Sequence, residues 1–356
     1  MDNKEFYVVI PAYDPNHLLI DLINNLNRSF PAFKYVVVND GSTKSDDIFK
    51  TLSTMDKVTV LTHEVNKGKG ATLKTAFRYL KENDVNAIIV MCDADGQHSP
   101  EDIKNVVQYY EKHDIHGIIL GCREFSKDMP KRSKFGNDAT VFLYRLVNQY
   151  YITDNQTGLR VFSNEILDDL IAINGDRYEY EMNMLTELNR KGIDIYETRI
   201  NTIYIDNNKS SHFRPVKDFL KICRNILKYG IPGFIGFCLE IGVFILFISL
   251  FQDKFTSLFA LVLQASLVSG IISFLFDVLI KCLGILYSNK WILKYKKKRK
   301  KYLLVSFATI ITNALITSLF VLLINDVINA KISSEIVSLT ITFVVRYLII
   351  PEPKIV

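Results

Sequence analysis

The sequence predicts an α/β domain with a mostly parallel sheet, followed by an all-α membrane domain of four helices. Short apolar runs alternate with longer helical patterns through roughly the first 213 residues. From about residue 229 onward the chain consists mainly of apolar stretches, each near the ~20 residues that a helix needs to cross a bilayer. A third observation is a run of eight Lys or Arg without any acid at 290–301, between two of these stretches.

The expected strands are short, apolar and rich in β-branched residues, which is typical of strands buried on both faces of a parallel sheet. They are 6–10, 35–39, 58–61, 87–92 and 117–120, with helical patterns such as 17–28 and 70–83 between them. In sheets of this kind, ligands bind beyond the carboxyl ends of the strands. A site is therefore expected in the stretches 11–14, 40–42, 63–70, 93–98 and 121–124.

Two aspartates, Asp93 and Asp95, directly follow the apolar run 87–92. In an extended chain, residues two apart point to the same side, so the two carboxylates can converge. Converging carboxylates repel unless a proton or a cation lies between them, and hard divalent cations prefer oxygen ligands. The alternative is that Asp95 begins a turn at Gly96 while Asp93 is solvated.

Several common sites do not fit the sequence. The stretch 11–16 reads PAYDPN where a dinucleotide-binding domain has GxGxxG. The stretch 66–71, NKGKGA, lacks the P-loop pattern, so it is either a tight turn into a helix or a loop that contacts a nucleotide. The five cysteines lack zinc-site spacing and are expected to be reduced and buried. The histidines are expected at the surface or at helix ends: His63, His98, His113 and His116.

Seven stretches follow one another in an order that resembles the family 2 glycosyltransferases of the GT-A fold. They are VVIPAYDPNHLL, VVVNDGSTKS, NKGKGATLKTAF, DADGQHSPEDI, GCREF with RSKFGN, DNQTGLRVFS and RYEYEMNMLTELNRKG. The nearest branch is the polyprenyl-phosphate glycosyltransferases that are similar to dolichyl-phosphate-mannose synthase. The resemblance covers about residues 5–225 and implies a transfer of sugar from a nucleotide donor to a lipid phosphate.

The resemblance implies a role for individual residues. The nucleotide sugar would be bound by Pro11, Ala12, Tyr13, Asp14, Asp40, Asp93, Asp154, Gln156 and Arg160. Mg²⁺ or Mn²⁺ would be held by Asp93, Asp95 and Gln97. The catalytic residues would be Asp95 with Arg123 and Arg132, the two arginines holding the acceptor phosphate. Asp14 stands where the family often has Glu or Asn, and Gly136 where the dolichyl synthases often have Ser. Apart from the resemblance, Lys69 in the loop 66–71 and Arg214 are further candidate contacts to the nucleotide sugar. Arg214 lies in the polar stretch 203–215, which is either a lid over the diphosphate or a surface linker.

The identity of the acceptor decides whether a base is needed. A lipid phosphate is largely ionised at pH 7, since its second pKa is near ~6, and needs arginines for positioning rather than a general base. A sugar hydroxyl would need a base, for which Glu179 and Glu181 are candidates. Their alternative is a solvated or Arg-paired helix face.

The second part of the chain is expected to lie in and on the membrane. An amphipathic interfacial helix is expected at 214–230, and a membrane domain at 231–356 that resembles the GtrA-like four-helix domain. The expected spans are about 229–251, 256–276, 302–324 and 333–350. The basic loop at 290–301 places both termini and the α/β domain in the cytosol, in line with the lack of a signal peptide at the start.

Three ionisable residues lie in or beside the expected spans: Glu240, Asp277 and Arg346. Such groups are costly in a membrane and mark either a polar path or a simple pair between helices.

These observations predict a metal-dependent, inverting glycosyltransferase that moves a hexose from a nucleotide-diphospho-sugar to a polyprenyl phosphate at the cytosolic membrane face. A UDP-hexose is the favoured donor, and GDP-mannose is the alternative. A lipid-linked-sugar transporter or scaffold with a degenerate first domain is the alternative of a different class. A processive synthase is disfavoured because the chain lacks QxxRW. The expected partners are the donor, the lipid phosphate and the bilayer, without nucleic acid; a homo-oligomer is compatible with the sequence.

Overall fold

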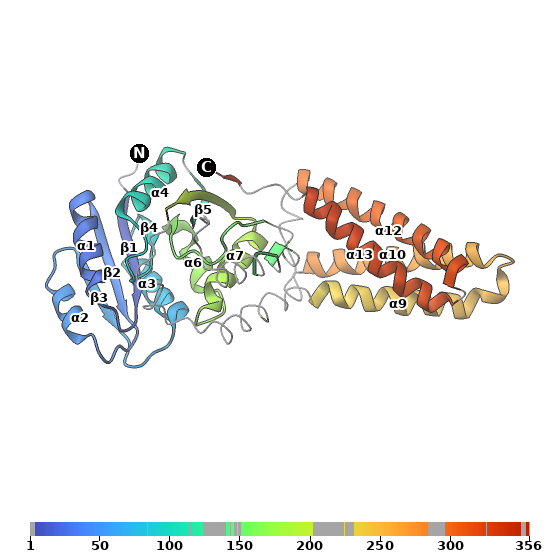
Figure 1. Ribbon diagram of the computed structural model, residues 1–356, viewed down its shortest axis with the longest axis horizontal. Coiled ribbons are helices and arrows are strands. Elements are labelled where there is room, and N and C mark those ends of the chain that lie inside the picture. Colours follow the sequence, from blue (N-terminus) through green and yellow to red (C-terminus); the bar gives the residue numbers. More distant parts are fainter. Residues whose placement is uncertain are drawn as a thin grey trace.

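The computed structural model contains an α/β domain and a bundle of long helices (Figure 1). It describes residues 4–83, 85–113, 115–123, 140–142, 144–145, 148, 151–201, 224, 231–283, 296–324, 326–349 and 354–355. The expected interfacial helix at 214–230 therefore lies almost wholly outside the described residues.

The α/β domain is built on one eight-stranded sheet in the order β3-β2-β1-β4-β6-β5-β7-β8. The strands are β1 (Glu5–Ala12), β2 (Phe33–Asn39), β3 (Val58–Thr62), β4 (Ala87–Met91), β5 (Gly117–Arg123), β6 (Arg160–Ser163), β7 (Asp194–Ile200) and β8 (Lys354–Ile355). All five expected strands are confirmed. β6 was not expected, and it runs antiparallel to β4 and β5 between them, whereas the remaining neighbours are parallel.

Helices cover both faces of this sheet because successive strand residues point to opposite sides. One face packs Val9, Val36 and Ile89 against α3 (Lys69–Glu82), α6 (Leu167–Ile171) and α7 (Glu179–Lys191). The other face packs Val8, Val37 and Val90 against α1 (Leu18–Ser29), α2 (Asp46–Ser53) and α4 (Pro100–Lys112). The predicted wound α/β architecture is therefore confirmed.

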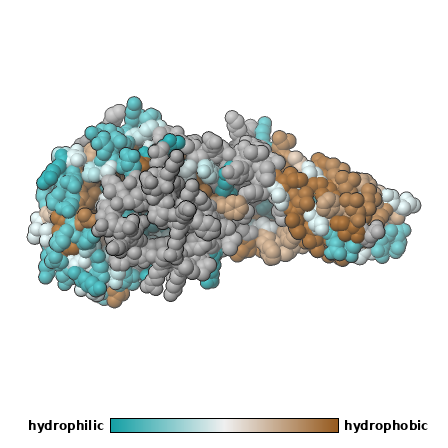
Figure 2. Space-filling model, in the orientation of Figure 1, coloured by the Kyte–Doolittle hydropathy of each residue, from teal (hydrophilic) through white to brown (hydrophobic). Residues whose placement is uncertain are grey.

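In the described residues, the bundle consists of four helices that pack in sequence order, each beside the next. They are α9 (Ile231–Phe251), α10 (Leu258–Leu283), α12 (Lys296–Ile324) and α13 (Val327–Ile349). Three segments of the described chain are long and apolar enough to cross a membrane: Ile231–Lys254, Leu258–Ile280 and Leu303–Ile324. Figure 2 shows apolar surface gathered over this bundle and polar surface over the α/β domain.

The fourth helix differs from its expected span. α13 begins at Val327, so Lys331 and Glu335 lie inside the helix rather than in or at the edge of a loop. The earlier start is stabilised because Lys331 Nζ lies 2.9 Å from Glu240 Oε1 and 2.5 Å from Glu335 Oε1. Asn313 on α12 donates hydrogen bonds to the same two carboxylates, at 3.1 and 2.6 Å.

This buried polar cluster contains the partner of Glu240, one of the ionisable residues within the expected spans. Glu240 lies near the middle of α9, and its partner Lys331 is only 1% exposed in its side chain. The contact joins α9 to α13, as expected for a pair between helices. The side chain of Arg346 lies outside the described residues.

The chain returns to the α/β domain after α13. β8 pairs in parallel with β7, with Lys354 opposite Tyr196 and Ile355 opposite Glu197. Figure 1 marks the C-terminus beside the α/β domain accordingly.

Candidate functional site

The predicted site residues gather at the carboxyl edge of the sheet. Asp14 follows β1, Asp40 follows β2, Asp93 follows β4, and Arg123 ends β5. Lys69 opens α3 after β3. Because neighbouring parallel strands bring their carboxyl ends to the same edge, residues far apart in the chain meet here.

The centre of the site is an ion cluster around Lys69. Its Nζ lies 2.6 Å from Asp93 Oδ1 and 2.9 Å from Glu181 Oε1, and its side chain is 16% exposed. Burial disfavours the ammonium, but the two carboxylates outweigh it and raise the pKa of Lys69. Likewise burial raises the pKa of Asp93, but Lys69 and other cations lower it overall. Asp93 is therefore an ionised carboxylate held by a lysine, rather than a solvated one.

Asp95 occupies a turn beside this cluster. The backbone N–H of Gln97 donates to Asp95 Oδ1 at 3.0 Å, and Gly96 has a φ of 74°. Burial, followed by the neighbouring charge of Asp93, raises the pKa of Asp95 to about 6. The turn expected at Asp95 is thus present, whereas Asp93 is paired with Lys69 rather than solvated, and the cation between the two carboxylates stays a prediction.

The stretch 154–160 lies directly against Asp93. A Cβ at Gly158 would lie 2.2 Å from Asp93 Oδ2, so no other residue fits without displacing the carboxylate. Arg160 is fully buried and donates from Nε to Thr157 O at 3.1 Å and from Nη1 to Glu181 O at 2.9 Å. Its Nη2 has no hydrogen-bond partner among the described residues.

Arg123 is oriented by Asp154. Its Nε donates to Asp154 Oδ2 at 2.7 Å, and its Nη2 donates to Asp154 Oδ1 at 3.1 Å. Asp154 is fully buried, so this pair fixes the guanidinium at the end of β5. The other two predicted arginines, Arg132 and Arg214, lie outside the described residues.

Asp40 and Asp14 hold loops in place. Asp40 is 3% exposed and accepts hydrogen bonds from the backbone N–H groups of Lys67 at 2.9 Å and Gly68 at 2.8 Å. Asp14 Oδ1 accepts from the N–H groups of Thr43 at 2.9 Å and Lys44 at 3.0 Å. The tight turn expected at 66–71 is therefore present and is held by Asp40, whereas contact of this loop with a nucleotide stays a prediction.

The remaining predicted nucleotide contacts lie at the same edge. Pro11 and Ala12 end β1, and the side chain of Ala12 is buried. Tyr13 is 36% exposed beside them. Gln156 donates its backbone N–H to Asp154 Oδ1 at 3.1 Å. Their contacts to a nucleotide stay predictions.

Two histidines are buried, although the histidines were expected at the surface or at helix ends, and His98 does directly precede the N-cap of α4. Glu181 is buried as well, and is neither solvated nor paired with an arginine. His63 is buried, with Nδ1 2.8 Å from Asp40 Oδ1 and Nε2 2.9 Å from Thr75 Oγ1. His98 is also buried, with Nε2 3.9 Å from Asp93 Oδ2. Glu181 is buried against Lys69, and Glu179 Oε1 accepts from the N–H groups that precede its helix. His63 and Glu181 are buried against partners distant in sequence, which no local pattern indicates, whereas the partner of His98 lies only five residues before it. Similarly, Cys238 is exposed on α9, although buried cysteines were expected.

The sequence did not indicate Glu197 on β7. It is 2% exposed and accepts from the backbone N–H and the hydroxyl of Thr153, both at 2.7 Å. Its only signal is one acidic residue within an otherwise strand-like pattern.

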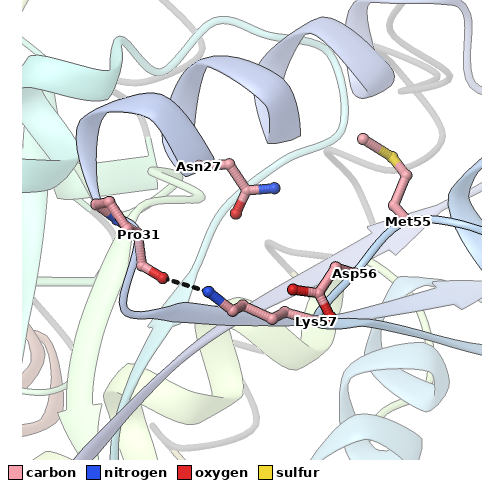
Figure 3. Close-up of a pocket in the computed structure, with 5 residues that line it drawn as sticks. All are labelled: Asn27, Pro31, Met55, Asp56 and Lys57. Carbon is pink, nitrogen blue, oxygen red and sulfur yellow. Dashed lines mark hydrogen bonds between the residues drawn. The ribbon is translucent and has the colours of Figure 1, made fainter.

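A surface hollow of about 280 Å³ lies elsewhere, near the amino ends of β2 and β3 (Figure 3). It is lined by Asn27, Pro31, Met55, Asp56 and Lys57. Lys57 Nζ donates to Pro31 O at 2.7 Å across it. The hollow lies at the opposite edge of the sheet from the charged cluster, so it is not part of the candidate site.

Comparison with known proteins identifies the domain. The family model described as Glycosyl transferase family 2 matches residues 7–171. A UDP-N-acetylglucosamine–dolichyl-phosphate N-acetylglucosaminyltransferase of Methanococcus voltae is 32% identical over 229 residues, covering 58% of this chain and 88% of that protein. The chain is a family 2 glycosyltransferase. The glycosyltransferase is also 24% identical over 208 residues to a polyprenol monophosphomannose synthase of Mycolicibacterium smegmatis, covering 54% of this chain and 75% of the synthase.

Solved structures resemble the glycosyltransferase more distantly. A glucosyl-3-phosphoglycerate synthase from Mycobacterium tuberculosis in complex with UDP is 18% identical, with a TM-score of 0.48, covering 64% of this chain and 80% of the synthase. The mannosyltransferase PcManGT from Pyrobaculum calidifontis, in complex with GDP-Man and Mn²⁺, is 17% identical, with a TM-score of 0.40, covering 58% and 59%. The mixed, mostly parallel sheet is GT-A-like, as the resemblance implied, although the antiparallel β6 within it was not expected.

Proposed function

We propose that the glycosyltransferase moves a hexose from a nucleotide-diphospho-sugar to a polyprenyl phosphate, at the cytosolic face of the membrane. The observation that carries this proposal is the edge of the sheet where Asp93, Asp95 and Lys69 lie in one cluster and Arg123 is fixed by Asp154. The names of both relatives refer to a polyprenol or a dolichyl phosphate. Attachment to a membrane bundle suits an acceptor that is itself a lipid.

A divalent cation, Mg²⁺ or Mn²⁺, fits the oxygen donors of the site. Asp93 and Asp95 repel one another, as the raised pKa of Asp95 indicates, and Gln97 adds an amide oxygen nearby in sequence. Among the described residues no three His, Cys, Asp or Glu side chains form a metal-binding group. The cation would therefore be held by two carboxylates, Gln97 and oxygens of the donor diphosphate. When bound, it stabilises charge on the leaving diphosphate.

The protein's own residues prepare the two reacting groups. Arg123 orients the acceptor phosphate, and its guanidinium suits phosphate oxygens. A phosphate oxygen attacks the anomeric carbon of the sugar, and the bond from that carbon to the nucleoside diphosphate breaks, with inversion. An ionised phosphate carries no proton to remove, so Glu181 is not required as a base and is instead paired with Lys69.

Lys69 connects the donor side of the site to this reaction. Its ammonium neutralises Asp93 in the structure and lies at the start of α3, where backbone N–H groups also favour anions. With the diphosphate bound, Lys69 would contact both the carboxylate and a phosphate oxygen.

The cytosolic location is supported by the path of the chain. The chain leaves the α/β domain after β7 and returns to it at β8, so it must cross the membrane an even number of times between them. Three apolar segments of the described chain are long and apolar enough to be spans, so α13 would be the fourth. The basic run 290–301 then lies on the side of the α/β domain, as expected for cytosolic loops.

A donor screen tests the proposal. Full-length protein in detergent would be mixed with Mg²⁺ or Mn²⁺, undecaprenyl or dolichyl phosphate, and labelled UDP- or GDP-sugars. Label in the organic phase with a UDP-hexose is the expected result; the name of the Methanococcus voltae relative favours UDP as the nucleotide. Label only from GDP-mannose would support the mannose alternative instead.

Matched variants separate an enzyme from a transporter or scaffold. Asp95→Ala should abolish transfer without changing membrane insertion, whereas Asp21→Ala, an exposed aspartate on α1, should leave transfer unchanged. Full transfer by Asp95→Ala in the presence of EDTA would contradict the metal assignment. Absence of transfer from every donor by folded wild-type protein would favour the transporter or scaffold.

A further inference from the structure

Glu197 is a buried carboxylate that the proposed reaction does not use. It lies on β7 with 2% of its surface exposed, and burial raises its pKa to about 7. Oε1 accepts the backbone N–H of Thr153, and Oε2 accepts the hydroxyl of the same residue, both at 2.7 Å. One side chain therefore satisfies two polar groups of a single loop residue.

The residue after Thr153 is Asp154, which holds Arg123. Asp154 is fully buried and binds the guanidinium through both carboxylate oxygens, at 2.7 and 3.1 Å. Fixing Thr153 restricts the backbone position from which Asp154 reaches Arg123. Glu197, Thr153, Asp154 and Arg123 thus form a continuous chain of contacts from β7 to the end of β5.

The sheet supports both ends of this series of contacts. β7 pairs in parallel with β5, with Glu197 opposite Leu120 and Ile200 opposite Arg123. Residues 151–159 contain no strand or helix, so their position depends on side-chain contacts of this kind. Sites on loops keep their geometry when a residue on a regular element supports them.

We infer that Glu197 is a positioning residue for the acceptor phosphate, acting through Thr153 and Asp154 on Arg123. The inference rests on the proposed acceptor role of Arg123. It concerns hydrogen bonding rather than charge: a neutral carboxyl can still accept from the N–H of Thr153 and donate to its hydroxyl. Gln can do the same, whereas Ala cannot.

The test compares Glu197→Gln and Glu197→Ala in the full-length protein, with Glu165→Gln, an exposed glutamate, as the matched control. The first readout is the rate at which phenylglyoxal, an arginine reagent, modifies Arg123, followed by mass spectrometry and normalised to Arg28. The second is KM for undecaprenyl phosphate against KM for the donor. The labelling readout needs no acceptor, so it stays informative if the proposed reaction is wrong.

Glu197→Ala should raise the rate of labelling of Arg123 severalfold and raise KM for the lipid phosphate roughly tenfold. The reason is that even a small displacement of the Arg123 guanidinium weakens its contact with the phosphate. KM for the donor should stay near that of the wild type, and Glu197→Gln should restore both values. A purely structural role would instead lower stability and affect both substrates together.

The inference is overturned if Arg123 labelling in Glu197→Ala equals that of the wild type, or if Glu197→Gln is as damaging as Glu197→Ala. If Glu197→Ala does not fold, Thr153→Val takes its place, since it removes the hydroxyl contact to Oε2 and leaves the backbone contact to Oε1. If labelling responds while wild-type protein transfers no sugar to any lipid phosphate, the chain of contacts stands and the proposed acceptor is wrong.

Discussion

Replacing Gly158 by Ala should inactivate the glycosyltransferase without unfolding it. The new Cβ would lie 2.2 Å from Asp93 Oδ2, 2.6 Å from Cγ and 2.8 Å from Oδ1. Ordinary contact begins at 3.4 Å, so the carboxylate must move by about 1.2 Å. Asp93 cannot move this far and keep its 2.6 Å contact with Lys69.

The expected size of the effect follows from this displacement. Misplacing a catalytic group by about 1 Å can cost ~100-fold in rate. That factor corresponds to about 3 kcal/mol of lost transition-state stabilisation. We therefore expect kcat/KM for the nucleotide sugar to fall by roughly two orders of magnitude.

The assay is the initial rate of transfer at several donor and metal concentrations, together with calorimetric binding of the nucleoside diphosphate. Gly242→Ala is the control, because a Cβ at this position of α9 meets no atom of the described residues within 4 Å, its own helix backbone and chain neighbours aside. Activity of Gly158→Ala within twofold of the wild type would refute the reasoning, since Asp93 would then not need its present position.

Three further predictions concern stability and topology. Lys331→Met leaves the carboxylates of Glu240 and Glu335 without their cation in the bundle, which costs about 3–5 kcal/mol for a buried pair. Its thermal midpoint in detergent should fall well below that of Lys254→Met, an exposed lysine three residues after the end of α9, and equal midpoints would contradict the role of the cluster. Burial raises the pKa of Glu197 from 4.5 to about 7. The contribution of the protonated carboxyl to the free energy of unfolding is therefore complete below pH 4.5. It is lost as the pH rises to 7, by about 3 kcal/mol. Glu197→Gln has no such titration. The difference between its thermal midpoint and that of the wild type should therefore increase in favour of the variant from pH 5 to 7 and stay constant above pH 7. A difference that does not change with pH would argue against the raised pKa of Glu197. Finally, a tag after β8 should be accessible from the same side of intact inverted vesicles as a tag before β1, and opposite accessibility would exclude four crossings.

Much of the fold follows from local sequence patterns. Short β-branched runs separated by helical patterns specify the strands 6–10 to 117–120, and their carboxyl ends specify the edge where Asp93 and Arg123 are found. Long apolar runs likewise specify α9, α10 and α12. These features are predictable because side-chain periodicity and hydropathy act on residues close together in the chain.

Other features depend on which elements become neighbours, and the sequence does not encode this locally. The insertion of β6 between β4 and β5 brings Gly158 against Asp93, and the docking of α7 brings Glu181 to Lys69.

The burial of His63 on Asp40 and the contact of Glu197 with Thr153 arise in the same way. In the bundle, Lys331 belongs to a stretch expected to be a loop, yet it lies inside α13, where it contacts Glu240, 91 residues earlier.

The sequence by itself thus determined the chemistry available at the edge of the sheet: carboxylates, a lysine and arginines suited to a diphosphate and a lipid phosphate. Only the tertiary structure decided which of these groups neutralise one another and which are held in place by others. The physical reason is that a charge removed from water needs a partner, and that partner is chosen by packing across the whole domain rather than by neighbours in the chain.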